Sequence, residues 1–245
     1  MTHKLTIELP QIKVACESCS LRKLCLPYGL DSSDMNLLDD IIKRPKAIEK
    51  HDYLFQAGQS FAAISVVRSG SIKTFTVANS GEQQVTGFHL PGEIVGFDGV
   101  SEDVHQCSAM ALETTTVCQL PFDGLEHIMV EVPGLQRQLH RIMSRELVEE
   151  QQMLLQIGKM TAEQRLAAFL INFALRLKQR GFSPNEFNFS MSRSDIANYL
   201  GLAVETVSRQ FTQFQNDGLI KTDRKFIRIL DFPGLNTISG LMTCQ

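Results

Sequence analysis

Three cysteines lie close together near the N-terminus, at Cys16, Cys19 and Cys25, with the spacing C-x2-C-x5-C. Closely spaced thiolates are suited to soft metal centres such as iron–sulfur clusters, zinc or copper(I). The chain starts without the long apolar stretch and small-residue cleavage site of a signal peptide. We therefore expect a cytoplasmic protein in a reducing environment, where disulfides are uncommon. The spacing predicts a metal site built on these three thiols.

A cluster that takes four thiolates needs one more cysteine from farther along the chain. The candidates are Cys107, Cys118 and Cys244. Cys118 ends an apolar, β-branched run that fixes its direction, whereas Cys107 lies in a polar stretch that we expect to be a loop. This favours Cys118 as the fourth ligand. Zinc is the alternative metal, although structural zinc sites usually pair two short C-x2–4-C motifs and only one is present.

A second motif, at residues 192–211, has the pattern of a helix-turn-helix. Ser192 and Asp195 have the spacing of a capping box, and Gly201 suits the turn, where a positive φ is needed. Apolar residues predict the inner faces of the two helices: Ile196, Leu200, Val204, Val207 and Phe211. Glu205, Ser208 and Arg209 then face outward, and such side chains recognise base edges in the major groove of double-stranded DNA.

The surroundings of this motif agree with a DNA partner. Residues 217–221 and 226–230 predict a two-stranded wing. Residues 1–158 carry 13 basic and 20 acidic side chains, while residues 159–245 carry 11 basic and 7 acidic ones, so the basic excess lies in the C-terminal part. An enzyme of thiol redox chemistry is the alternative class. No nucleophile–base pair, phosphate-binding glycine loop or pair of carboxylates supports it.

Between these motifs, short β-branched and aromatic runs predict strands at 53–55, 63–67, 71–77, 84–88 and 114–118. Five glycines fall where turns are needed, at Gly58, Gly70, Gly81, Gly92 and Gly99. This spacing is typical of a compact antiparallel barrel or roll. No apolar run is long enough to cross a membrane, so we expect no membrane partner.

Residues 133–158 predict one long helix with a narrow apolar stripe, formed by Leu139, Met143, Leu147, Leu154 and Ile157. A narrow stripe suits a two-stranded seam in a homodimer, and the alternative is packing on its own domain. Glu150 lies on the same stripe. In a parallel pair two Glu150 carboxylates would repel each other, which predicts a marginally stable seam. Gly158 is expected at the joint before a second helix, over 159–179.

Taken together, the chain resembles the oxygen-responsive FNR/Anr regulators of the cyclic-AMP receptor protein superfamily. The resemblance extends from Cys16 to about Leu230. It rests on the cysteine spacing, on Thr86-Gly87-Phe88-His89-Leu90, on residues 111–122 and on residues 198–209. It implies an α+β fold with a cluster-binding segment at 1–30, a β-roll sensory domain at 31–132, a dimerisation helix at 133–158 and a winged helix-turn-helix at 159–245.

The resemblance also implies a function. Cys16, Cys19, Cys25 and Cys118 would hold a [4Fe–4S] cluster, leaving Cys107 and Cys244 as spare thiols. The cluster-bound homodimer would bind palindromic TTGAT-N4-ATCAA-like DNA and control genes of anaerobic metabolism. Oxygen would degrade the cluster and favour the monomer. Contact with RNA polymerase, through the β-roll turn around Gly81, is implied in the same way.

The superfamily suggests one rival ligand, a cyclic nucleotide. Nucleotide-binding members carry a Gly-Glu for the ribose and an Arg before Ser/Thr-Ala for the phosphate. This chain keeps Gly92-Glu93, but Cys107 stands where the arginine is needed. A cyclic phosphate would lose its strongest charge-assisted partner, so we expect no cyclic nucleotide as effector.

Overall fold

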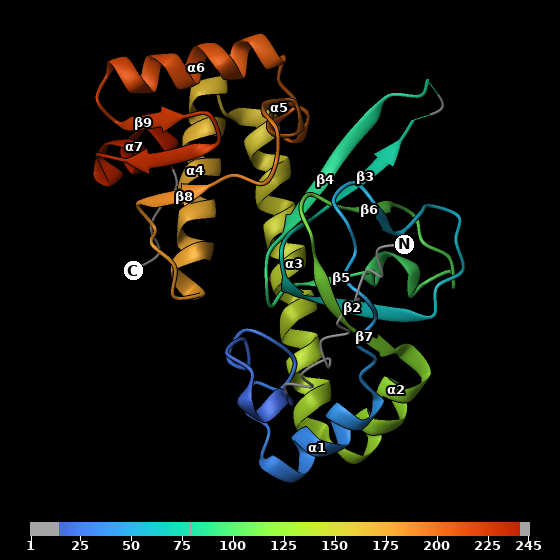
Figure 1. Cartoon of the computed structure of the whole chain (residues 1–245). Helices are drawn as coiled ribbons and strands as arrows, with labels where there is room; N and C mark the ends of the chain where they lie inside the picture. Colours follow the sequence, from blue (N-terminus) through green and yellow to red (C-terminus); the bar gives the residue numbers. More distant parts are fainter. Residues whose placement is uncertain (1–14, 79, 241–245) are drawn as a thin grey trace, which may run out of the picture.

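A computed structural model describes residues 15–78 and 80–240 of the chain (Figure 1). The N-terminal segment opens with a short 3-10 turn, η1 (Cys16–Ser18), and continues through tight turns into helix α1 (Ser32–Ile41). Asp31 caps this helix by accepting a hydrogen bond from the Asp34 amide at 2.9 Å. The cysteine segment is therefore an irregular stretch anchored to a regular helix.

The strands that follow are antiparallel and form two sheets. They are β1 (Tyr53–Phe55), β2 (Ala63–Ser69), β3 (Ile72–Val77), β4 (Gln83–His89), β5 (Ile94–Val95), β6 (Ser108–Ala111) and β7 (Thr116–Pro121). One sheet has the order β1-β6-β3-β4 and the other β5-β2-β7. Each of the five predicted strands overlaps an observed strand, and the predicted roll is confirmed.

Residues 103–107, expected to be a loop, form turns and bends around a single bridge residue, so this expectation is confirmed. The strand that follows, β6, was not predicted, and its residues Ser108, Ala109 and Met110 pair with Phe75, Thr74 and Lys73 of β3. Ser108, Ala109 and Met110 are small or flexible residues, so β6 lacks the β-branched residues that mark a strand in the sequence. Pairing with β1 on one side and β3 on the other, rather than the preference of its own residues, makes this segment extended.

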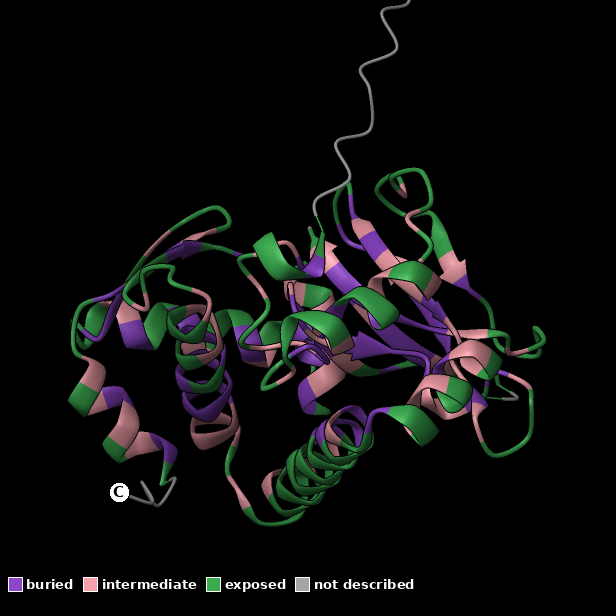
Figure 2. Cartoon of the chain, turned by 90° about the horizontal axis from the view of Figure 1, so that it is seen from below, coloured by how far each residue is buried: buried purple, intermediate pink, exposed green. Residues whose placement is uncertain are grey.

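Helix α2 (Phe122–Glu131) leads into the long helix α3 (Pro133–Lys159), which begins with proline in its first turn. The first half of α3 packs into the apolar core below the β5-β2-β7 sheet through Leu135, Leu139 and Ile142. Its second half is largely exposed, as the green length of helix in Figure 2 shows. Gly158 lies inside α3, so the joint falls at Met160 instead, where the backbone becomes extended.

The C-terminal part consists of α4 (Ala162–Gln179), β8 (Glu186–Asn188), α5 (Arg193–Leu200), α6 (Val204–Asn216), β9 (Ile220–Asp223), β10 (Phe226–Ile229) and α7 (Phe232–Ser239). The two wing strands pair as predicted, and β8 adds a third strand in the order β8-β10-β9. A single apolar cluster joins this part to the β-roll, because Phe88 and Leu90 of the roll pack with Phe169 and other side chains of α4.

Candidate metal site and nucleic-acid interface

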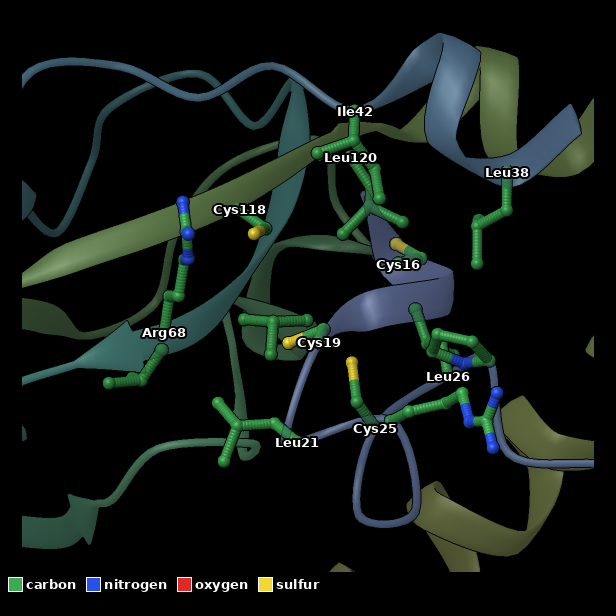
Figure 3. Close-up of a pocket in the computed structure, with 14 residues that line it drawn as sticks. Cys16, Cys19, Leu21, Cys25, Leu26, Leu38, Ile42, Arg68, Cys118 and Leu120 are labelled. Atoms are coloured by element: carbon green, nitrogen blue, oxygen red, sulfur yellow. The ribbon is translucent and has the colours of Figure 1, made fainter. Parts of the chain in front are cut away.

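Four cysteines line one pocket between the N-terminal segment and the β-roll. Cys16 lies in η1, Cys19 follows it, Cys25 lies in the next turns, and Cys118 lies on β7. The pocket holds a cavity of roughly 30 Å³, and its other walls are mainly apolar. Figure 3 shows the four sulfur atoms around a common space. The structure thus brings together the four thiols that the sequence favours.

Contacts with three helices and strands fix the cysteine segment in place. The Cys16 amide donates to Asp39 on α1 at 3.2 Å, and Gln138 of α3 donates to the Cys25 carbonyl at 3.4 Å. Leu26, beside Cys25, is 1% exposed and belongs to the core below the sheet. Cys118 is set by its pairing with Val66 of β2. Cys16, Cys25 and Cys118 are therefore positioned by contacts with different elements, α1, α3 and β2.

The surroundings of the thiols disfavour free thiolates. Burial raises the pKa of Cys16 to about 12, and burial also raises the pKa of Cys25 strongly. Burial likewise raises the pKa of Cys118, although the nearby Arg44 and Arg68 guanidinium groups partly offset it. In the metal-free chain these thiols are neutral, so a metal must displace their protons on binding.

The side chains of this pocket that could bind a soft metal are all thiols. In the described parts of the chain, no three His, Cys, Asp or Glu side chains converge as ligands of a single metal ion would. A four-iron cluster would place its four thiolates on different iron atoms. The purely sulfur donor set is also the one that iron–sulfur clusters use.

The remaining cysteines are separate from this pocket as far as the structure describes them. The Cys107 thiol and amide both donate to Asp98, at 3.3 and 3.0 Å. Asp98 also contacts the buried His105 ring, which stacks on Phe55 with 3.6 Å between ring centroids. Cys107 therefore belongs to a local polar cluster of the β-roll. Cys244 lies outside the described residues.

The helix-turn-helix has the local geometry that its sequence predicts. The Ser192 hydroxyl accepts from the Asp195 amide, and the Asp195 carboxylate accepts from the Ser192 amide, completing the capping box. Gly201 takes a φ of +63°, and Val207 and Phe211 are buried. Val204 is an exception: it starts α6 and is 38% exposed, because no preceding turn of helix covers it.

The outer face of α6 is free to contact a ligand. Glu205, Ser208 and Arg209 are all exposed on this helix, as predicted from its apolar period. Behind them, Arg193 at the start of α5 lies over the ring of Phe211, 3.2 Å from its centroid. This cation–π contact joins the two helices, and the sequence pattern alone did not indicate it.

The stripe on α3 divides into two parts. Leu139 is 5% exposed and packs inside its own domain, whereas Met143, Leu147, Leu154 and Ile157 are 39–72% exposed. Glu150 is exposed among this second group. The apolar side chains of this second group therefore have little cover from their own chain, whereas Met153 packs against the core of the C-terminal part.

Glu93, which in nucleotide-binding proteins would face a ribose, has intramolecular partners here. Its carboxylate accepts hydrogen bonds from Arg176 of α4, from Arg180 at the C-terminal cap of that helix, and from the Leu90 amide at 2.8 Å. No local feature of the sequence predicted these pairs. The two arginines engage the Glu93 carboxylate, which is the group that a cyclic nucleotide would require.

Comparison with known proteins agrees with both halves of this architecture. Residues 45–131 match the cyclic nucleotide-binding domain family, and residues 164–238 match the Crp-like helix-turn-helix domain family. Within the described residues, no helix is long and apolar enough to span a membrane.

Several curated relatives match almost the whole chain. The transcriptional activator protein FnrA of Stutzerimonas stutzeri is 50% identical over 94% of this chain and 94% of its own length. The transcriptional activator protein anr of Pseudomonas aeruginosa is 49% identical, with 95% and 94% covered. The fumarate and nitrate reduction regulatory protein of Vibrio cholerae is 43% identical, with 93% and 91% covered.

Among solved structures, FixK2 from Bradyrhizobium japonicum aligns with a TM-score of 0.74 at 25% identity, covering 83% of this chain and all of that one. A CooA variant from Carboxydothermus hydrogenoformans shares the fold, with a TM-score of 0.65 at 19% identity. The fold, the exposed recognition helix and the near-complete alignments lead to one assignment: the chain belongs to the FNR/Anr-type transcriptional activators of the cyclic-AMP receptor protein superfamily.

Proposed function

We propose that this protein is an oxygen-responsive transcriptional regulator that holds a [4Fe–4S] cluster on Cys16, Cys19, Cys25 and Cys118. The observation that carries the proposal is the pocket in which these four thiols surround one space. The same chain presents an exposed recognition helix at its other end. A reducing cytoplasm would keep the thiols available for metal.

When bound, such a cluster supplies an oxygen-sensitive cross-link between the N-terminal segment and the β-roll. The chain's own residues position the two sides of that link. Leu26 and the hydrogen bond from Gln138 hold the segment against the first half of α3, and β2 holds Cys118 in register. Loss of the link would leave the irregular segment with few buried side chains of its own.

We propose that α3 forms the dimer seam through its exposed apolar side chains, Met143, Leu147, Leu154 and Ile157, with Leu139 anchoring the helix in its own domain. Two α3 helices in parallel would bury this stripe and place the two α6 helices, one from each subunit, side by side as recognition helices. Each subunit would then contact one half of a TTGAT-N4-ATCAA-like palindrome through Glu205, Ser208 and Arg209. RNA polymerase would contact the β-roll turn around Gly81.

Two alternatives have less support. A structural zinc site usually pairs two short C-x2–4-C motifs, and the sequence has one, at Cys16 and Cys19. A cyclic nucleotide needs a free Glu93 and a phosphate-binding cation. Glu93 is bound by two arginines, and Cys107 stands at the position of that cation and is bonded to Asp98.

The test is anaerobic purification with iron and sulfide analysis. We expect close to four iron and four sulfide per chain, lost in the Ala variants of Cys16, Cys19, Cys25 and Cys118. The control is Cys107→Ala, a thiol of the same domain outside the pocket, which should retain the cluster. A colourless anaerobic protein that contains stoichiometric zinc would refute the proposal. DNA binding should fall when the iron-loaded protein is exposed to air.

A further inference from the structure

The β-roll and the DNA-binding domain are joined by a compact ion-pair network. Glu93 follows Gly92 in the turn between β4 and β5, and its carboxylate accepts from Arg176 Nε at 3.0 Å and from an Arg180 guanidinium nitrogen at 2.5 Å. The Arg180 side chain is 3% exposed and the Glu93 side chain 25%. Although burial opposes ionisation, the adjacent Arg176 and Arg180 guanidinium groups hold the pKa of Glu93 at about 2.

Backbone groups of the same turn complete the network. Arg176 also donates to the Phe88 carbonyl, and Arg180 donates to the Pro91 carbonyl at 2.6 Å. Two planar guanidinium groups therefore bind one carboxylate and two carbonyls in fixed directions, a geometry that a lysine cannot reproduce. This network fixes the position of α4 relative to the roll.

The other side of the turn touches the cysteine segment. A Cβ atom added at Gly92 would lie 3.1 Å from Leu24 Cβ, so Leu24, next to Cys25, packs closely against this glycine. The Gly92 amide donates to the Val67 carbonyl at 2.7 Å, and the backbone carbonyl of Glu93 accepts from the Val67 amide at 3.0 Å. The turn is thereby tied to β2, the strand that pairs with the strand of Cys118.

A second contact sets the orientation of the helix-turn-helix itself. Lys73 of β3 pairs with Asp195 of α5 at 2.5 Å, and the Asn198 side chain of α5 bonds to the backbone of Gln83 and Val85 on β4. These contacts use α5 and leave the outer face of α6 exposed. The docked position is therefore compatible with contact between α6 and DNA.

We propose that Glu93, Arg176 and Arg180 are positioning residues that hold the DNA-binding domain ready to bind, and that the cysteine segment supports them through Leu24 and Gly92. The regulatory half of this inference rests on the proposed cluster. The network then couples metal occupancy to DNA affinity within one chain, in addition to any effect on dimerisation. Two sites coupled through such a contact must share a two-state element, here the docked and released α4.

The first experiment compares Arg180→Gln with Lys178→Gln in the full-length, anaerobically prepared protein. Lys178 lies in the same turn of α4 and is exposed, so both variants lose one positive charge from the same region. We expect fluorescence anisotropy on a palindromic duplex to show about tenfold weaker binding for Arg180→Gln and less than twofold change for Lys178→Gln. Sedimentation should give both variants the dimerisation constant of the parent.

Glu93→Gln sharpens this comparison because it removes a negative charge, which should strengthen nonspecific DNA binding. We expect it to weaken specific binding about tenfold nevertheless. The double variant Glu93→Gln/Arg180→Gln should lose no more than either single variant, since both remove one interaction. If Arg180→Gln does not fold, Arg180→Lys replaces it in the experiment, because lysine keeps the charge but lacks the planar guanidinium group. Arg180→Lys should recover only part of the parental DNA affinity.

Hydrogen exchange tests the link to the cysteine segment. In the parent, peptides from the C-terminal half of α4 should exchange slowly without oxygen and faster after exposure to air. In Glu93→Gln they should exchange fast in both conditions, and in Lys178→Gln they should behave as in the parent. Equal DNA affinity for Arg180→Gln and Lys178→Gln, or unchanged exchange in the parent after measured loss of iron, would overturn the inference. If the parent contains no iron, the proposed function fails, while the DNA comparison still tests the network.

Discussion

The cysteine segment and the helix-turn-helix are held in place by different kinds of interaction. The segment around Cys16, Cys19 and Cys25 consists of tight turns with one fully buried side chain, Leu26. The helix-turn-helix has a capping box, a left-handed glycine and a set of almost fully buried apolar side chains: Ile196, Ala197, Leu200, Val207, Phe211 and Phe214. The second region is stabilised by its own packing, whereas the first would gain stability from the cluster that we propose for its thiols.

The largest expected effect comes from removing a core side chain of the DNA-binding domain. Phe214 is fully buried, so Phe214→Ala should cost about 3–5 kcal/mol of unfolding free energy. Denaturation followed by circular dichroism measures this cost, and Gln213→Ala, at the exposed neighbouring position of α6, is the control. DNA binding should be lost while the iron content stays at the parental level. Loss of iron as well would show that the two regions are not independent in stability.

A smaller effect is expected from the exposed face of the same helix. Arg209→Ala should weaken specific binding by about 1–3 kcal/mol and relax the preference for guanine in the half-site, without changing stability. Binding to duplexes with single base changes, at two salt concentrations, separates base recognition from phosphate contact. Full discrimination at every base pair, with only a reduced salt dependence, would reassign Arg209 to the DNA backbone.

The two regions also differ in how far the sequence alone could predict them. The helix caps, the turn glycine and the apolar periodicity are local features, so the helix-turn-helix was predicted almost completely. The predicted burial of Val204 was wrong, because periodicity takes no account of the exposed end of a helix. The cysteine spacing is local too. Convergence with Cys118 depends on the pairing of β2 with β7, for which a single sequence gives no direct signal.

The network of Glu93 with Arg176 and Arg180 shows the same limit more strongly. Glu93 is more than 80 residues from either arginine in the chain, and each of the three is an ordinary charged residue in its local context. Only the docking of α4 on the roll brings them together. The strand after Cys107 was missed for a related reason, since its neighbours in the sheet rather than its own residues make it extended.

Helix α3 connects the two regions, and its acidic side chains predict that the stability of the protein depends on pH. Burial, followed by repulsion from Glu93, Glu149 and Glu150, raises the pKa of Glu146 to about 8. Between pH 4.5 and 8 the unfolded chain releases this proton and the folded chain keeps it, so stability must fall as pH rises through that window. The slope is on the order of 1 kcal/mol per pH unit.

Glu146→Gln should remove this slope, because glutamine carries no charge in either state. We expect the variant and the parent to unfold alike near pH 4.5 and the variant to be more stable at pH 8. Urea unfolding across this range measures the difference, and Glu163→Gln, on a different helix, controls for the loss of one carboxylate. Parallel pH profiles for parent and Glu146→Gln would mean that Glu146 is ionised and solvated.

The smallest expected effect concerns Glu150, on the exposed part of the same helix. In the proposed parallel dimer two Glu150 carboxylates would face each other among Leu147 and Leu154, and their repulsion would oppose association. Because both groups start from an exposed position, the repulsion should amount to roughly 1 kcal/mol, close to a fivefold change in the dimerisation constant. Glu150→Ala should therefore be more dimeric in air and bind DNA without the cluster.

Analytical ultracentrifugation of the aerobic protein decides the point. Glu131→Ala, an exposed acid of α2 distant from the stripe, should sediment like the parent. If Glu150→Ala does the same, the seam is not balanced by this charge, and control by the cluster must act through the docking of the DNA-binding domain instead.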